Sequence, residues 1–398
     1  MKKSEDGGNP KKTPRNPRVR AGLTVLVVAL AAVALWKGPG LWRLLNERAA
    51  YAGKTPTFVG DSNSLERTVI VPTLDTPRPR GKNVIWCSSF QLAWNEIRDN
   101  VIGAPLQVLG AEEVARRLNE AQQSVADLEP DSYYAKGGWI EDGIIDTIEK
   151  EMAARFPSHE LPDFNDCNDP AGILAYSYLV ANVPFKYPFR QLDDGLTFAD
   201  SQGTETQVGG FGLWEGFMSQ YKEMREQIEV LYLRSEDPNY PWPAKEYALD
   251  LCRHSRPYQV VVAMVEPKDS LGETLAYIEH GITEFERWAY YKWVRFLREG
   301  QELRVPEMFW RIDHRYTDLI GKVVANMGMP IVEARQAIEF RLDRSGAMLE
   351  SEALIAMSAA GENFLFDRPF LVYMKKRGAD QPFFVMWVDN AELLTRQP

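Results

Sequence analysis

The C-terminal part of the chain contains the pattern that most constrains its fold. Runs rich in β-branched and aromatic residues occupy Ile338 to Leu342, Phe364 to Met374 and Phe383 to Val388. Such runs predict β-strands. Helix-spaced apolar residues come earlier, in 111–126 and 143–156. Helices that precede a group of strands favour an α+β fold over an alternating parallel one.

The middle of the chain mixes both kinds of element. Residues 173–183, 228–233 and 258–265 have strand composition, whereas 269–296 and 316–327 have mostly helical spacing. Aromatic and basic residues alternate in 285–296, and their helical spacing favours core packing over binding of single-stranded nucleic acid. We find no fixed repeat and no low-complexity tract in this core.

The N-terminus has the pattern of a targeting signal. Basic residues precede an uncharged apolar run from Ala21 to Trp36. This predicts a basic cytoplasmic tail over 1–20, a transmembrane signal anchor or signal peptide over 21–42, and an extracytoplasmic main domain. Ala32-Val33-Ala34 offers a cleavage site, so the chain is membrane-anchored, or secreted if residues 1–34 are removed.

The remaining chain divides at a proline-rich segment. Residues 43–82 contain Pro56, Pro72, Pro77 and Pro79, which predicts a stalk or linker before a domain over 83–398. The net charge is −10 although the first twenty residues are strongly basic, so the rest of the chain is more acidic still. This balance argues against nucleic acid as a general partner.

Motifs for catalysis or metal binding are missing from the sequence. It has no G-x-S-x-G, H-E-x-x-H, phosphate-binding G-x-x-x-x-G-K or C-x-x-C motif. The four histidines are scattered, and Cys87, Cys167 and Cys252 do not have metal-ligand spacing. We therefore expect no enzyme activity, no metal and no cofactor. An unrelated extracytoplasmic enzyme, with His254 and His280 in a cleft, is the alternative.

An ordered series of motifs runs through the C-terminal half. A strand-like stretch, 303–309, comes before a predicted helix that ends at Ala325-Asn326-Met327-Gly328-Met329; the strand 338–342 leads to Gly346, a loop, and Phe366 to Tyr373. This order resembles the serpin family. Earlier segments agree, since Asn83-Val84-Ile85 resembles the first strand of the serpin core. The resemblance covers about residues 83–391.

The resemblance implies a large central mixed β-sheet, smaller sheets, surrounding helices and an exposed reactive loop. In serpins the cleaved loop inserts into the sheet as an extra strand and traps a serine protease as an acyl-enzyme. The loop here begins at Gly346, and its expected inward-facing residues are Ala347, Leu349, Ser351, Ala353 and Ile355. The scissile bond aligns with Ala360-Gly361, which suits a protease that prefers small residues.

The residues that move in serpins depart from the family pattern. The serpin Ser-Pro-x-Ser becomes Cys87-Ser88-Ser89-Phe90, so Ser88 and Phe90 take the positions beneath the opening sheet. Gln336 replaces the partner histidine, and Arg344 replaces the hinge glutamate. These changes imply an alternative function, a non-inhibitory serpin-fold binding protein. The target protease and the oligomeric state are left open by the sequence.

Overall fold

The computed structural model divides the chain into two compact units, Met1–Lys54 and Thr55–Pro398. It describes parts of the second unit only: residues 55–157, 161, 164, 167, 169–214, 222–237, 242–288, 291–298, 300–345 and 363–397. The predicted tail and anchor, 1–20 and 21–42, lie outside these residues. Among the helices of the described ranges, none has the length and apolar character needed to span a bilayer.

The largest sheet is mixed and has seven strands in the order β10-β11-β12-β19-β20-β3-β2. Among the described strands of this sheet, only β2 and β3 pair in parallel. The strands are β10 (Glu229–Ser235), β11 (Ala244–Asp250), β12 (Tyr258–Met264), β19 (Phe370–Lys376), β20 (Pro382–Val388), β3 (Asn83–Cys87) and β2 (Thr68–Ile70). Every residue of β3 and β20 is buried, so both faces of the sheet are covered there.

Two smaller sheets have three and two strands. One has the order β1-β14-β17, with β1 (Phe58–Asp61), β14 (Met308–Arg315) and β17 (Arg335–Leu342). The other pairs β4 (Tyr133–Trp139) with β5 (Ile173–Leu179). The large mixed sheet and the smaller sheets implied by the serpin resemblance are thus present, and β17 and β5 belong to different small sheets and are not paired with each other.

The other strands form a four-stranded sheet and two hairpins. The four-stranded sheet comprises β18 (Asn363–Leu365), β13 (Glu302–Pro306), β9 (Gly210–Leu213) and β6 (Arg190–Gln191). The hairpins are β7 (Leu196–Ala199) with β8 (Glu205–Val208), and β15 (Val323–Val324) with β16 (Met329–Pro330). Gly212 lets β9 approach β13, because a Cβ there would lie 1.8 Å from the Leu303 carbonyl oxygen.

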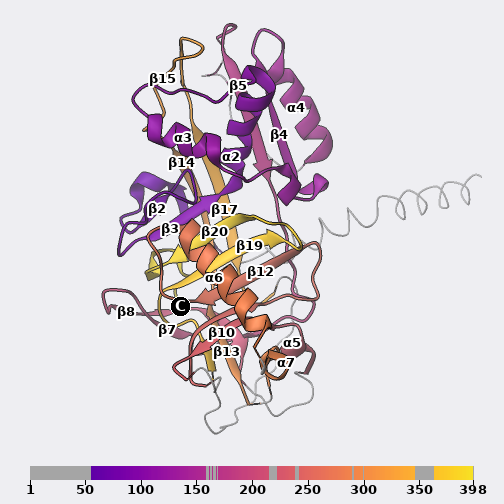
Figure 1. Cartoon of the computed structure of the whole chain (residues 1–398), viewed down its shortest axis with the longest axis vertical. Coiled ribbons are helices and arrows are strands. Elements are labelled where there is room, and N and C mark those ends of the chain that lie inside the picture. The colour runs from indigo at the N-terminus through magenta and orange to yellow at the C-terminus, as the bar shows by residue number, and fades with distance from the viewer. Residues whose placement is uncertain are drawn as a thin grey trace, which may run out of the picture. The chain divides into compact units, whose positions relative to one another are not determined.

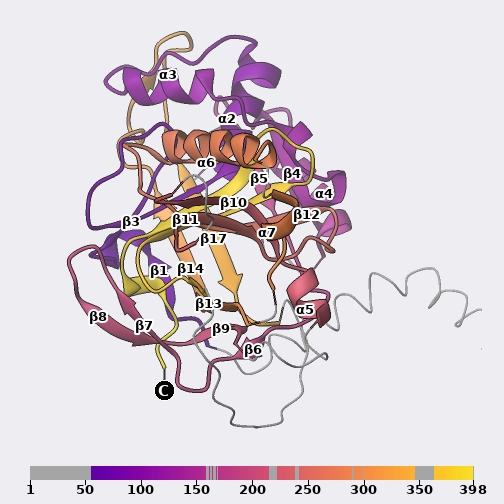
Figure 2. The same ribbon diagram turned by 60° about the horizontal axis from the view of Figure 1, so that its bottom comes forward.

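The helices cover the sheets. They are α2 (Ser88–Asn95), the π-helix η2 (Glu96–Ile102), α3 (Glu112–Glu120), α4 (Ile144–Arg155), α5 (Lys222–Glu226), α6 (Leu271–Glu286) and α7 (Tyr291–Val294). Short 3-10 turns are η1 (Ser62–Ser64), η3 (Val125–Asp127), η4 (Pro130–Ser132) and η6 (Ala391–Leu393). Helix α6 lies across the seven-stranded sheet (Figure 1) and on one of its faces (Figure 2). Its Gly281 allows close approach, because a Cβ there would be 2.7 Å from the Tyr232 ring.

The predicted helix over 316–327 is wrong. Turns and the β15–β16 hairpin occupy this stretch instead. Val323 and Val324 are β-branched and pair in the hairpin, and Gly328 has a φ of +71°, a conformation that a helix does not contain. Val324 also bridges to Val108, so a tertiary contact outweighs the helical spacing.

The folded unit begins earlier than the expected domain boundary at residue 83. In the segment expected as a stalk, β1 pairs with β14 and β2 pairs with β3. Ile70, Val71 and Leu74 are buried in the main core. The prolines of this segment therefore mark turns inside the fold, because the strands between them are short.

Candidate functional site

Among the strands of the described ranges, β5 pairs only with β4, so its other edge has no strand partner there. The Ile140 N–H donates to the Gly172 carbonyl at the end of the β4–β5 ladder. Hydrogen-bonded and non-bonded pairs alternate along an antiparallel ladder, so even-numbered residues of both strands bond across it. Ala175 and Ser177 therefore point their backbone N–H and C=O groups away from β4.

Strand β17 has a matching edge. Phe309 of β14 lies opposite Arg341 of β17. The Phe309 carbonyl, however, points away from β17 and accepts from the Thr57 N–H at 2.6 Å, so Phe309 and Arg341 are a non-bonded pair. By the same alternation, Ala337 and Glu339 point their backbone groups away from β14. No strand of the described ranges pairs with this edge. Unpaired edges of this kind can accept a further strand.

The N-terminus of α2 bridges the two edges. The Ser177 hydroxyl of β5 donates to the Ser89 carbonyl oxygen. The Gln336 side-chain amide of β17 donates to the Ser89 hydroxyl at 2.7 Å. One residue thus contacts both strands, and the region between β5 and β17, with the start of α2 beneath it, is called the slot below.

Gln336 is fully hydrogen-bonded although it is buried. Its amide nitrogen also donates to the Cys87 carbonyl at 3.0 Å, and its oxygen accepts from the Tyr316 hydroxyl at 2.6 Å. Burial raises the pKa of both the Tyr316 phenol and the Cys87 thiol. These groups are therefore neutral at ordinary pH, and the cluster holds the slot closed by hydrogen bonds between uncharged groups.

The residues predicted to lie beneath the sheet make different contacts from one another in the structure. The Phe90 ring packs against the Tyr316 ring, with ring centroids 4.0 Å apart and an interplanar angle of 35°. The Ser88 hydroxyl is buried and has no hydrogen-bond partner among the described residues. Ser89 and Ser177, which sequence reasoning missed, make the contacts instead. Ser89 belongs to the aligned motif Cys87-Ser88-Ser89-Phe90. Whether Ser88 or Ser89 contacts β5 and β17 depends on where α2 begins.

The far end of the slot is closed at Arg344. Its carbonyl accepts from the Phe189 N–H at 2.9 Å. At one end of the slot, Ser177 of β5 and Gln336 of β17 both contact Ser89. At the other end, Phe189 bonds to Arg344, and each of these residues comes later in the sequence than the first pair. Strands β5 and β17 therefore run in the same direction. A segment that leaves β17 after Arg344 and turns back would be antiparallel to both strands. The predicted loop residues, Gly346 to Gly361, lie outside the described residues.

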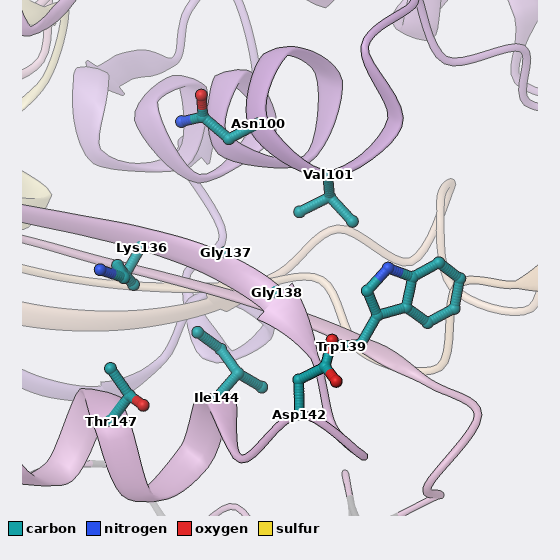
Figure 3. A pocket seen from close by; sticks show the side chains of 9 residues that line it. All are labelled: Asn100, Val101, Lys136, Gly137, Gly138, Trp139, Asp142, Ile144 and Thr147. Carbon is teal, nitrogen blue, oxygen red and sulfur yellow. The ribbon is translucent and has the colours of Figure 1, made fainter.

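An open pocket of about 440 Å³ lies between η2, β4 and the start of α4 (Figure 3). Gly137 and Gly138 of β4 leave its wall without side chains. Lys136, Asp142 and Thr147 give it a mixed polar lining. It holds no nucleophile beside a base, so we assign it no catalytic role.

No catalytic or metal-binding cluster forms in the part of the chain that the structure describes. No group of three or more His, Cys, Asp or Glu residues there has metal-ligand geometry. His314 shares a 2.7 Å hydrogen bond with the Ser62 hydroxyl, and among the described residues no carboxylate bonds to its ring to complete a triad. The expected absence of enzyme activity stays a prediction.

Comparison with known proteins gives matches at the level of structure. No protein-family model and no curated protein matches the chain. Similar solved structures include Serpin48 from the insect Tenebrio molitor, with 11% identity over 77% of this chain and 92% of that chain and a TM-score of 0.43. Native protease nexin-1 with heparin has 11% identity over 78% and 92%, with a TM-score of 0.42. Thyroxine-binding globulin with thyroxine has 11% identity over 78% and 93%, with a TM-score of 0.41.

Proposed function

We propose that this chain is a serpin-like inhibitor of a serine protease that prefers small residues. The loop after Gly346 is the bait, and after cleavage it inserts into the slot. The observation that supports this most is the pair of edges at Ala175–Ser177 and Ala337–Glu339, which lack strand partners in the described ranges. An inserted strand would hydrogen-bond to both edges and join two small sheets into one.

Loop length and alternation fit the slot. From Arg344 back to Gln336 the slot spans roughly 26 Å at ~3.3 Å per residue. Residues 346–355 are long enough to cover it. Alternating residues of the loop, from Ala347 to Ile355, would face the core, and Glu350 and Glu352 would face outward. No charge is then buried by insertion.

The test is incubation of the chain with an elastase-like protease, followed by denaturing gel electrophoresis. We expect a covalent complex that survives denaturation. Ser351→Arg places a charge on the inward face, so it should still be cleaved but form no complex. Glu350→Arg, on the outward face, is the matched control and should keep the complex. Cleavage of the unmodified chain without any complex would rule out inhibition.

A second candidate function is a non-inhibitory binding protein. Its support is the closed slot, in which Ser89 fastens both edges and Phe90 packs against Tyr316. For insertion these contacts must break, and the Phe90 ring must be accommodated beneath the new strand. In this case nicking within 354–361 should leave the melting temperature nearly unchanged, whereas an inserted loop should raise it strongly.

We also propose that residues 21–42 anchor the chain with its main domain extracytoplasmic. The support is the basic flank before the apolar run in the sequence. Protease treatment of intact cells should then digest the main domain, whereas secretion would place the chain in the medium with its N-terminus near residue 35. Protection of the main domain in intact cells would contradict both.

A further inference from the structure

The pocket between η2, β4 and α4 lies along the outer edge of β4 (Figure 3). Even-numbered residues of β4 hydrogen-bond to β5, so its odd-numbered residues point their backbone N–H and C=O groups away from β5. Within the described ranges no strand other than β5 pairs with β4. Gly137 and Trp139 are the odd-numbered β4 residues that line the pocket, which we call the edge pocket.

Two helices wall the edge pocket on opposite faces of β4. A Cβ on Gly137 would lie 3.1 Å from the Glu96 Cβ and 3.4 Å from the Val101 side chain, so η2 covers one face closely. A Cβ on Gly138 would lie 3.1 Å from the Ile144 side chain, so α4 covers the other face. A ligand therefore reaches the backbone of Gly137 through the opening between the two helices.

The open part of the β4 edge is short. The Tyr133 carbonyl accepts from the Arg155 guanidinium at 2.8 Å, and the Trp139 carbonyl accepts from the Asp142 N–H at 3.2 Å. Between these two, the outward backbone groups of Gly137 make no hydrogen bond with a described residue. A long added strand would meet the turn at Asp142, whereas a segment of about three residues, roughly 10 Å at ~3.3 Å per residue, fits.

Opposite charges stand at the two ends of the edge pocket. Lys136 lies at one end, and Asp142 lies beside Trp139 at the other, with the two glycines between them (Figure 3). The Lys136 ammonium is 3.6 Å from the Glu151 carboxylate, and its three donors leave it able to bind a second acceptor. The Asp142 side chain is exposed, and no described cation forms an ion pair with it. The edge pocket can therefore bind a cation at one end and an anion at the other.

We propose that the edge pocket binds a short peptide of about three residues with free termini, as an added strand antiparallel to β4. The middle residue pairs with Gly137 and exchanges two backbone hydrogen bonds with it. The peptide ammonium meets Asp142 and the peptide carboxylate meets Lys136, so the two charges fix the direction of the peptide.

The walls of the edge pocket favour an apolar middle residue. Residues directly opposite each other in an antiparallel pair have their side chains on the same face, so this side chain lies on the η2 face, toward Val101 and Trp139. A volume of about 440 Å³ is in the range of small-ligand sites. The proposal goes beyond the inhibitor function, because the slot uses β5 and β17 and the edge pocket uses the outer edge of β4.

The test is calorimetric titration of the full chain with the tripeptide glycyl-leucyl-glycine and its capped forms. We expect the free tripeptide to bind. N-acetylation should weaken binding at least about tenfold, because the charged hydrogen bond to Asp142 is lost. C-terminal amidation should weaken it about threefold, because Lys136 is shared with Glu151. If a form capped at both ends binds as tightly as the free one, the site takes an internal strand of a longer chain, and the proposal is wrong.

Variants of the two charged residues test the same contacts from the protein side. Asp142→Asn should weaken binding of the free tripeptide at least about tenfold, and Lys136→Gln about threefold. The matched controls are Asp146→Asn and Lys150→Gln, at exposed positions of α4 that do not line the edge pocket, and both should bind normally. Equal losses in D142N and D146N, or no binding by the unmodified chain, would overturn the proposal.

A second measurement follows amide hydrogen exchange by NMR in the unmodified chain. The Gly137 N–H should exchange quickly in the free protein and slowly with saturating tripeptide, because the added strand accepts its hydrogen bond. The Gly138 N–H bonds within the β4–β5 ladder, so it serves as the internal reference and should change little. Unchanged exchange at Gly137 in the presence of bound tripeptide would place the peptide elsewhere and contradict the proposal.

Discussion

Gln336 shows how a single buried side chain can hold two elements in place. Its amide uses both N–H donors and its oxygen, and its three partners come from α2, the residue before α2 and Tyr316. A buried amide normally costs stability unless it is satisfied in this way. The slot is therefore closed by a specific hydrogen-bond pattern and not by apolar packing alone.

Replacing Gln336 with Leu should lower stability. The change leaves the Tyr316 hydroxyl, the Ser89 hydroxyl and the Cys87 carbonyl without their partner, at a cost of about 2–4 kcal/mol in total. Urea unfolding measures this. Glu339→Gln, on the exposed face of β17, is the control and should change the free energy of unfolding by less than about 0.5 kcal/mol. Equal stability of Q336L and the unmodified chain would show that the cluster is not required.

His314 should make stability depend on pH. Burial lowers its pKa to about 4, although Asp61 and Asp318 oppose the shift. The unfolded chain, with a histidine pKa near 6.5, binds the proton more readily, so stability is fully present above about pH 6.5 and is lost as pH falls toward 4. The loss from this group is at most about 3 kcal/mol.

The measurement is the free energy of unfolding of H314Q and of the unmodified chain between pH 7 and pH 4. Carboxylates contribute equally to both, so the difference between the two curves isolates the imidazole. We expect the curve of H314Q to be flatter over this range. Parallel curves would mean that the Ser62–His314 contact does not bury the ring as described.

At the scale of elements, the direction of backbone groups along β17 predicts two different effects of proline. The Ala337 N–H points to the open edge of the slot, whereas the Ile338 N–H bonds within the β14 ladder. Proline removes the N–H group and is tolerated on strands only at such edges.

Ala337→Pro should therefore leave the free energy of unfolding within about 1 kcal/mol but prevent the rise in melting temperature that cleavage of the loop would cause. Ile338→Pro should destabilise the native state by about 3 kcal/mol or more. Calorimetry before and after nicking measures both. If A337P and the unmodified chain gain the same stability on nicking, no strand enters at this edge.

At the scale of the whole molecule, the first two strands of the folded unit form the edges of two different sheets. β1 extends the sheet of β17, and β2 extends the seven-stranded sheet. Glu392, near the C-terminus, accepts from the backbone N–H groups of Glu66 and Arg67 and from the Thr68 hydroxyl, at 2.6–3.1 Å. The two ends of the folded unit are thus joined.

A chain that starts at residue 83 should be much less stable than one that starts at residue 55. Loss of the buried Ile70, Val71 and Leu74 removes about 1.5–3 kcal/mol each, which is comparable to the whole stability of many domains. Circular dichroism and urea unfolding of the two chains measure the difference. Equal urea midpoints for the two chains would mean that residues 55–82 do not stabilise the domain, as the stalk predicted from the prolines requires.

The sequence determined the elements whose pattern is local and strong. Residues 144–155 form a helix, and 258–264, 335–342 and 382–388 form strands, as predicted, because apolar periodicity reports which side of an element is buried. The ordered motifs of the C-terminal half also carried the resemblance to the serpin family. The helix over 316–327 and the stalk were mispredicted where contacts distant in sequence outweigh local propensity.

Only the tertiary structure decided which atoms close the slot. Ser89 meets Gln336 and Ser177 across sequence separations of 247 and 88 residues. The Ser255 hydroxyl, on the turn that follows β11, likewise donates to the Pro184 carbonyl in the segment after β5. Contacts of this kind depend on how strands pair and where a helix begins, and no local pattern records them. The sequence determines which chemical groups are present. Which of these groups contact one another depends on how segments distant in the sequence pack together.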